Sequence, residues 1–364
     1  MKIVYDYQTF TLQSYGGISR YFIRLAEELK AKGNDVNIFA PYHCNQLLTK
    51  LPEAMVKGVK ISSEFSKPSA MMMLLANHLI SRKAIKQWRP DIFHETYFSL
   101  RSNAPIGCPT VVTVYDMIHE KFPKYFSRFD PTGNWKEKAV KRATHIICIS
   151  ESTKRDLLEL FPDLHNKVSV VHLGFSTTQI IEEIENGQRP YLLYVGTRSG
   201  HKNFLTLLNA FASSQKLRSG FNLVAFGGRT FTTSELQLIN DLGLKETQII
   251  QVGGNDEILT RYYRNASAFI YPSIYEGFGL PPLEAMAQNC PVVSSNTSSM
   301  PEVIGVAGEF FDPNSIDEMR EAIERVVFSS SRSRELIELG KKRLEMFTWQ
   351  NCADQTLNIY NKLI

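Results

Sequence analysis

Two glutamates on either side of a glycine-bearing loop form the most chemically informative segment of the chain. Glu276 and Glu284 stand eight residues apart and enclose Gly277-Phe278-Gly279-Leu280. The glycines allow the backbone to aim its N–H groups at an anion, and a helix that begins near Pro281 adds the positive end of its dipole. This pattern is suited to holding a sugar and a phosphate together, with one carboxylate available to sugar hydroxyls and the other to a ribose.

Short apolar strands that alternate with amphipathic helices must position these residues. We expect strands in the first half at 2–5, 35–39, 92–94, 110–114, 145–149 and 168–172, and in the second half at 191–195, 222–225, 249–252, 268–271 and 291–294. This alternation predicts an α/β fold with parallel sheets and helices on both faces. Because ligands bind beyond the carboxyl ends of such strands, we expect two Rossmann-like domains that face each other across a cleft.

A polar stretch at 176–189 separates the two runs of strands and is the expected linker. The first domain would then cover 1–175 and the second 176–349, with 350–364 forming a helix that packs back on the first domain. At 364 residues the chain is long enough for two such cores.

The segment 271–287 resembles the donor-site motif of retaining glycosyltransferase family 4, whose members have the two-domain GT-B fold. The resemblance rests on the two glutamates separated by seven residues, the GFGLP core and the EAMA that follows. It extends back to Tyr191 and is looser in the first half. It implies that Glu284 binds the ribose and that Glu276 faces the transferred sugar near the reacting carbon. It also implies that the loop between them, Gly277, Phe278, Gly279 and Leu280, lies against a nucleotide-sugar donor.

The loop after the strand 191–195 carries two cations in a position that the same family uses. It runs from Gly196 through Arg198 to Lys202. The resemblance implies that Gly196 lies at the donor, and both cations can neutralise the pyrophosphate leaving group as the glycosidic bond breaks. The family usually has its arginine directly after the glycine, whereas Arg198 stands one place further on. Lys202 keeps the family position.

The first half offers fewer matches. Gly16 and Gly17 lie between the first strand and its helix, where the family has a glycine-rich turn near the donor phosphates. Relatives have His-Asp where this chain has Tyr115 and Asp116, so Asp116 is kept as a candidate catalytic residue and the role of the family histidine is open. His119, three residues further on, is either a second residue of the same site or an ordinary surface histidine.

Charge bears on the expected partners. The net charge of +4 combines a balance of +8 up to Phe175 with −4 beyond it. A basic first domain suits an anionic partner such as a lipid pyrophosphate or a phospholipid surface, although an ordinary solvated surface has the same balance. Met71, Met72 and Met73, followed by Arg82, Lys83 and Lys86, are a candidate for peripheral membrane contact or for an acceptor-binding wall, with core filling as the alternative.

The remaining composition excludes several classes of protein. The five cysteines are scattered with no CxxC pair, and no Asp-x-Asp or His/Cys cluster is present, so we expect neither a metal nor another cofactor. No segment has the pattern of an export signal or a membrane span. We expect a cytoplasmic protein, with peripheral attachment to the inner face of the membrane as an option, and no nucleic-acid partner.

Together these features predict a metal-independent hexosyltransferase, and the family resemblance implies that it retains the configuration at the sugar carbon. It would move a sugar from a nucleotide-sugar to a saccharide or lipid-linked saccharide, in the biosynthesis of a bacterial surface polysaccharide such as O-antigen or capsule. No residue marks a committed nucleophile, so we expect attack from the face that the nucleotide leaves. A GT-B sugar-nucleotide epimerase and a non-catalytic nucleotide-sugar-binding subunit remain alternatives. A nicotinamide oxidoreductase is disfavoured because no GxGxxG follows the first strand.

Overall fold

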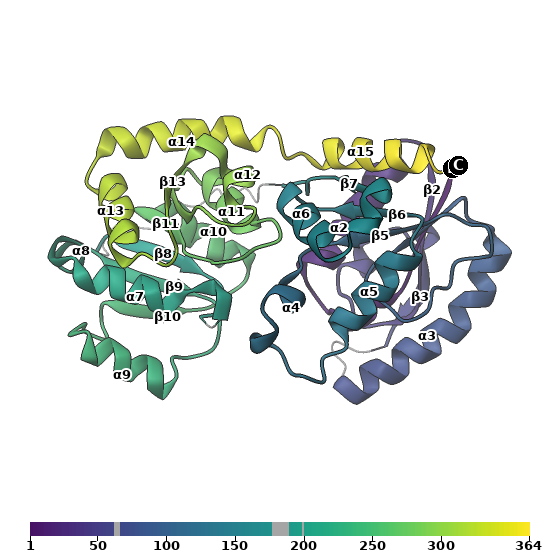
Figure 1. The fold of residues 1–364 in the computed structure, drawn as a ribbon, viewed down its shortest axis with the longest axis horizontal. Helices are drawn as coiled ribbons and strands as arrows, with labels where there is room; N and C mark the ends of the chain where they lie inside the picture. The colour runs from purple at the N-terminus through teal and green to yellow at the C-terminus, as the bar shows by residue number, and fades with distance from the viewer. Residues whose placement is uncertain (62–65, 177–188, 199) are drawn as a thin grey trace. The chain divides into compact units, whose positions relative to one another are not determined.

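The computed structural model describes residues 1–61, 66–176, 189–198 and 200–364. They divide into two compact units, Met1–Gly174 with Thr348–Ile364 and Phe175–Phe347, each built on its own sheet (Figure 1). The divisions expected from the sequence lie after residues 175 and 349. The expected linker at 176–189 falls, apart from its two end residues, outside the described residues.

The first unit contains a parallel sheet in the order β3-β2-β1-β4-β5-β6-β7. Its strands are β1 (Lys2–Tyr5), β2 (Asp35–His43), β3 (Val56–Lys60), β4 (Ile92–Glu95), β5 (Thr110–Val114), β6 (His145–Cys148) and β7 (Val168–Val170). Its helices are α1 (Gln8–Leu12), α2 (Gly17–Ala31), α3 (Lys67–Trp88), α4 (Ile118–Lys121), α5 (Thr132–Arg142), α6 (Glu151–Leu160) and α15 (Trp349–Asn361). Ile3, Val4 and Tyr5 of the central strand are fully buried, as expected for a parallel strand covered on both faces.

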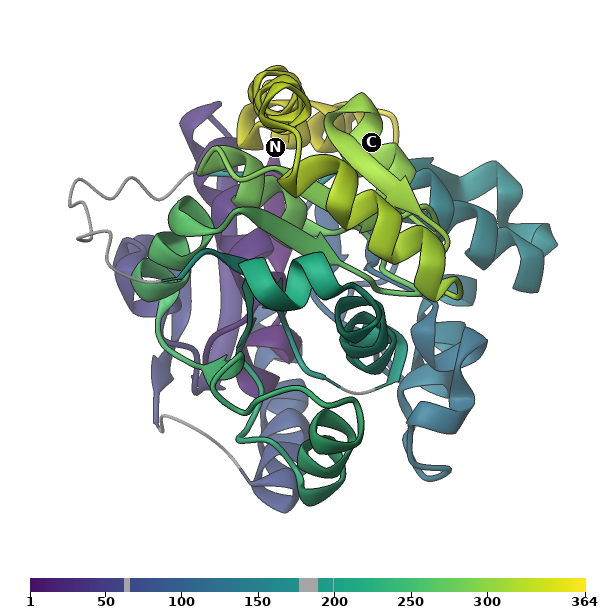
Figure 2. The ribbon, with the colours of Figure 1, turned by 90° about the vertical axis from the view of Figure 1, so that its left-hand side faces the viewer.

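The second unit contains a parallel sheet in the order β10-β9-β8-β11-β12-β13. Its strands are β8 (Tyr191–Val195), β9 (Asn222–Phe226), β10 (Ile249–Val252), β11 (Ala268–Tyr271), β12 (Val292–Ser295) and β13 (Gly308–Phe311). Its helices are α7 (Phe204–Ser213), α8 (Gln215–Gly220), α9 (Thr233–Asp241), α10 (Asp256–Asn265), α11 (Leu280–Ala287), α12 (Met300–Ile304), α13 (Ile316–Val327) and α14 (Ser330–Leu344). Figure 2 shows its strands in green, with α13 and α14 in yellow-green beside them.

Both sheets have a point where the direction of strand order reverses. In the first unit it lies between β1 and β4, and in the second between β8 and β11. Ligands of open parallel sheets bind beyond the carboxyl ends of the strands at such a switch point. The loops after β8 and β11 are those that carry Lys202 and Glu276.

The α/β fold class is confirmed, but several expected strands are corrected. The strand expected at 35–39 is β2, which continues to His43. The strands β3 and β13 were absent from the sequence prediction, because each lies at a sheet edge and its short sequence contains polar residues or glycine. The strand expected at 168–172 ends at Val170.

The helix α15 is part of the first unit, although it follows α14 of the second unit in the chain. It packs on α2; α15 is drawn in yellow and α2 in purple in Figure 1. Its Tyr360 is fully buried, and the Tyr360 hydroxyl lies 2.5 Å from Nδ1 of His94, which belongs to β4. A buried polar contact therefore joins the end of the chain to the centre of the first sheet.

Candidate active site

Lys202 and Glu276 form an ion pair where β8 and β11 end. The Nζ atom of Lys202 lies 2.6 Å from Oε1 of Glu276, and both side chains are mostly buried, with 22% and 14% of their surface exposed. The two strands are parallel neighbours, so the loops that follow them emerge at the same edge of the sheet. A cation and a carboxylate that are far apart in sequence thus meet at the switch point.

Hydrogen bonds between the two loops hold this pair in place. The backbone N–H of Ile274 donates to the carbonyl of His201 over 2.7 Å. The amide of Asn203, directly after Lys202, donates to the carbonyls of Pro272 and Pro313 over 3.1 and 2.8 Å. The position of Lys202 relative to Glu276 is therefore set by the backbone as well as by their own attraction.

Two serines in the segment after β12 support the Glu276 loop, and sequence reasoning missed both. The hydroxyl of Ser298 donates to the carbonyl of Glu276 over 2.6 Å, and that of Ser299 donates to the carbonyls of Glu276 and Phe278 over 2.9 and 2.7 Å. Ser299 is fully buried. Nothing in the local sequence of Ser298 and Ser299 indicates a contact with a loop 22 residues earlier.

Glycines shape both loops. Gly196 ends β8 with a φ of +137°, and its N–H donates to the carbonyl of Phe226 on β9. Gly279 precedes α11 with a φ of +107°. Both conformations are strained for any residue with a side chain. These two glycines, like Gly277 between the glutamates, lie within the loops that the sequence motif singled out.

The ring of Tyr271 lies beside the ion pair. Its ring centroid lies 5.8 Å from Nζ of Lys202. Burial, followed by the negative charge of Glu276, raises the pKa of the Tyr271 hydroxyl well above its ordinary value. The hydroxyl therefore stays protonated and available as a hydrogen-bond donor to Glu276.

The residues of the motif after Glu276 have different surroundings. Glu284 lies half-buried on α11, and its Oε2 accepts a hydrogen bond from the hydroxyl of Tyr263 over 3.2 Å. The side chain of Phe278 is buried against Phe347, with ring centroids 5.6 Å apart. Leu280 is half-buried at the first position of α11. The donor-binding roles implied for these residues stay predictions, and for Phe278 the contact would have to come from its backbone.

Arg198 is engaged by a neighbouring loop. Its Nε atom lies 2.8 Å from Oε1 of Glu235, and its two terminal nitrogens donate to the carbonyls of Gly227, Arg229 and Thr230. Only 5% of the side chain is exposed. Burial alone would raise the pKa of Glu235, but hydrogen bonds from Arg198 and Thr232 outweigh it and lower this pKa below its ordinary value. The guanidinium of Arg198 thus holds the loop after β9.

The first-unit candidates lie at the carboxyl ends of β1 and β5. Gly16 is the residue before α2 and Gly17 is its first residue, at the helix N-terminus. Asp116 is partly exposed, accepts from the backbone N–H of Ile118 and lies 3.7 Å from Nζ of the buried Lys136. These strands are separated by β4 in the sheet, so the two groups of candidates are not adjacent.

His119 lies on the short helix α4. Its ring stacks on Phe126 at 3.9 Å, and Nε2 lies 3.9 Å from Oδ2 of Asp130. Its Nδ1 is buried and has no hydrogen-bond partner among the described residues, and the same holds for the hydroxyl of Tyr115. The roles of Asp116 and His119 stay predictions.

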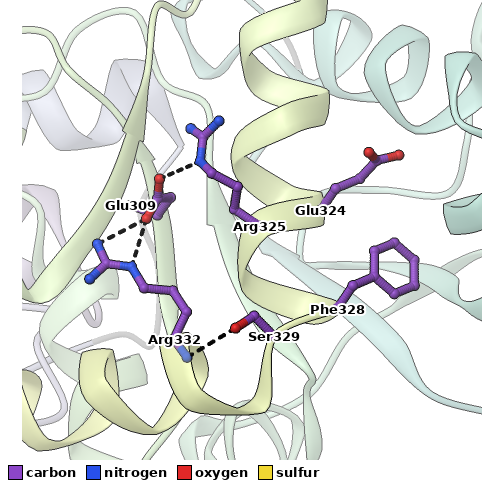
Figure 3. Close-up of a pocket in the computed structure, with 6 residues that line it drawn as sticks. All are labelled: Glu309, Glu324, Arg325, Phe328, Ser329 and Arg332. Carbon is purple, nitrogen blue, oxygen red and sulfur yellow. Dashed lines mark hydrogen bonds and ion pairs between the residues drawn. The ribbon is translucent and has the colours of Figure 1, made fainter.

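A separate cavity of about 580 Å³ lies beside β13, an edge strand of the second sheet (Figure 3). It is lined by Glu309, Glu324, Arg325, Phe328, Ser329 and Arg332. Glu309 stands near the start of β13, and ion pairs of 2.7 and 2.9 Å to Arg325 and Arg332 already balance its charge. This cavity therefore has no part in the strand-end site.

The described residues offer neither a metal centre nor a membrane-spanning helix. Across the described ranges, no three His, Cys, Asp or Glu side chains gather in a way that could hold a metal ion. No helix in the same ranges has the length and apolar character needed to cross a bilayer.

Comparisons with known proteins agree with the motif. Residues 15–179 match the family model described as Glycosyltransferase Family 4, and residues 176–343 match the model described as Glycosyl transferases group 1. The chain belongs to glycosyltransferase family 4. The two matches meet at the boundary between the two structural units.

Individual relatives of this family 4 glycosyltransferase extend over almost its whole length. The O-antigen chain mannosyltransferase B of Escherichia coli is 27% identical over 95% of this chain and 96% of its own. The O-antigen chain mannosyltransferase RfbU of Salmonella typhimurium is 28% identical over 85% of this chain and 87% of its own. Among solved structures, Anabaena HepE in complex with UDP-glucose superposes with a TM-score of 0.71 at 17% identity, over 100% of both chains. The last comparison supports the GT-B fold.

Proposed function

We propose that this glycosyltransferase moves a hexose from a nucleoside diphosphate sugar to a saccharide or lipid-linked saccharide in the assembly of a bacterial surface polysaccharide. Mannose is the favoured sugar, since the two relatives described above are named as O-antigen mannosyltransferases. The acceptor would be bound by the first unit and the donor by the second. The observation that carries the proposal is the Lys202–Glu276 pair at the switch point of the second sheet.

The pair can act on both halves of a donor at once. An ammonium group has three N–H donors, so Lys202 can hold Glu276 and a phosphate oxygen together. Its charge would stabilise the diphosphate as the bond to the sugar breaks, when negative charge on the leaving group grows. The carboxylate of Glu276, held on the other side of that ammonium, is then placed to accept hydrogen bonds from sugar hydroxyls.

Retention without a metal ion is part of the proposal. Retaining glycosidases use a carboxylate as a nucleophile that forms a covalent glycosyl-enzyme. Glu276 is bound to Lys202 and supported by Tyr271, which lowers its readiness to act as a nucleophile. We therefore favour attack by the acceptor hydroxyl on the face that the nucleotide leaves, with the departing phosphate oxygen taking the hydroxyl proton.

A transfer assay tests the proposal. Thermal shift against UDP-, GDP-, ADP- and dTDP-sugars first identifies the donor, because a bound ligand raises the melting temperature. The anomeric configuration of the product is then read by NMR, and retention is expected. Glu276→Gln should lower kcat about 100-fold or more, because it removes a charge near the reacting carbon. Inversion at the sugar carbon, or isolation of a sugar attached to the enzyme, would contradict the mechanism.

A control separates transfer from the alternative chemistry. Without acceptor, an epimerase would exchange isotope or configuration within the nucleotide-sugar, whereas a transferase should leave it unchanged apart from slow hydrolysis. Donor binding with no transfer to any saccharide and no epimerisation would identify a binding subunit instead.

A further inference from the structure

The solvent-facing side of α3 is unusually apolar for an exposed helix. Five large apolar side chains lie on it with 47–66% of their surface exposed: Met71, Met72, Leu75, Leu79 and Ile80. Met71 and Met72 lie four and three residues before Leu75, and Leu79 lies four residues after it, so these four share one face of the helix. An exposed apolar patch of this kind marks a surface that meets a partner.

The opposite side of the same helix segment is polar where it meets the core. Asn77 and Ser81 are fully buried there. The Asn77 amide donates to the Tyr42 carbonyl over 2.7 Å, and Ser81 donates to the Asn77 carbonyl over 2.6 Å. These hydrogen bonds and the packing of the buried Ile85 therefore hold α3 on the sheet, while its exposed apolar residues face solvent. An ordinary surface helix has the reverse arrangement.

The last turns of the exposed side carry positive charge. Arg82, Lys83 and Lys86 are all exposed, and α3 contains no aspartate or glutamate. The edge strand β3 adds the exposed Lys57 and Lys60. The charge of Arg101 also reaches α3. Burial, followed by the charges of Arg82 and Arg101, lowers the pKa of His78 on this helix.

We propose that this apolar and basic side of α3 docks the protein on an anionic lipid surface. A helix that lies in the plane of a membrane buries apolar side chains among the acyl chains and holds lysines and arginines near the phosphates. A single protruding helix suits a deformable bilayer and needs no matching groove in a partner. A second copy of the chain is disfavoured, because isologous pairing would bring two basic surfaces together.

Vesicle sedimentation tests the proposal with the full-length protein. Vesicles of phosphatidylcholine with phosphatidylglycerol should bind it, vesicles of phosphatidylcholine alone should bind it far less, and added salt should weaken the binding. The apolar triple variant Met72→Gln, Leu75→Gln, Leu79→Gln should lose at least about tenfold in affinity. The basic triple variant Arg82→Gln, Lys83→Gln, Lys86→Gln should lose a similar factor.

A matched variant in the second unit is the control. Val306→Gln, Met346→Gln, Lys341→Gln and Lys342→Gln replace exposed apolar and basic residues elsewhere and should leave vesicle binding unchanged. Circular dichroism checks that each variant is folded. Transfer to a water-soluble acceptor should be the same in all of them, so failure of the docking proposal and failure of the proposed function are distinguishable.

Several results would overturn the assignment. They are equal binding to neutral vesicles, unchanged binding by both triple variants, or no vesicle binding by the wild type. Loss of a dimer in the apolar triple variant, seen by light scattering, would make this side of α3 an interface between copies. Retention on polyglutamate without vesicle binding would indicate an acidic protein partner.

Discussion

At the scale of single residues, the two cations of the β8 loop have different surroundings. Lys202 pairs with one carboxylate of the motif, whereas Arg198 spans Glu235 and three backbone carbonyls. A guanidinium presents several N–H groups in a rigid fork and can hold such a set of acceptors, which an ammonium cannot. We infer that Arg198 acts mainly by positioning the loop after β9 beside the donor site.

Replacing Arg198 by alanine tests this inference. Glu235 and the carbonyls of the loop would be left buried without their partner, so the free energy of unfolding should fall by about 1–3 kcal/mol. Lys202→Ala, which removes a more exposed side chain, should cost less stability. Urea unfolding of the two variants gives the comparison. Equal stability with a loss of nucleotide affinity like that of Lys202→Ala would instead show that Arg198 binds phosphate directly.

The sequence pattern offered candidate site residues in the second unit, but it did not indicate the residues that support their loops. The spacing of Glu276 and Glu284 and the glycines between them follow from chemistry that a local pattern can carry. The contacts of Ser298 and Ser299 with the Glu276 loop, and of Asn203 with Pro272, join segments far apart in the chain. Such contacts depend on strand order, which the sequence pattern alone does not specify.

At the scale of elements, α15 is joined to the first sheet through a titratable group. The fully buried His94 has Tyr360 at one ring nitrogen and Thr113 at the other, over 2.5 and 2.9 Å. Burial lowers the pKa of His94 to about 3. The imidazole is neutral in the folded protein, so it can donate to one hydroxyl and accept from the other.

Acid should therefore weaken the first unit through His94. Between pH 6.5 and about 3 the unfolded chain binds a proton at this position and the folded chain does not, so stability falls as the pH falls through that range. Urea unfolding at pH 7 and pH 4.5 should give a smaller difference for His94→Gln than for the wild type. The exposed His165 provides the control variant His165→Gln, which should keep the wild-type difference. An unchanged difference in His94→Gln would contradict this account.

The edge strands β3 and β13 were not predicted from the sequence, whereas the edge strands β7 and β10 were. The strand β3 has the sequence VKGVK and is mostly exposed, and β13 has the sequence GEFF. A strand at the edge of a sheet can lack the continuous apolar run of a central parallel strand, because one side meets solvent or a helix end. The strands β7 and β10 keep enough apolar residues to be predicted, as the central strands do.

At the scale of the whole molecule, the two units share one sheet topology but carry different residues where the strand order reverses. Both sheets reverse their strand order once, and in the second unit the switch point carries the charged pair of the proposed donor site. In the first unit the corresponding edge carries the turn at Gly16 and Gly17 and the buried Asp6, whose pKa burial raises. The second unit therefore carries the charged pair that we propose to bind a diphosphate. The first unit carries the basic helix α3.

Calorimetric titration of the nucleoside diphosphate of the identified donor, compared between the wild type and Lys202→Ala, tests the central claim most directly. The account predicts that the variant binds the diphosphate at least about tenfold more weakly, since a charge-assisted hydrogen bond is lost, while its affinity for the nucleoside without phosphates stays the same. Equal diphosphate affinity in the two proteins would contradict a donor site built around Lys202 and Glu276.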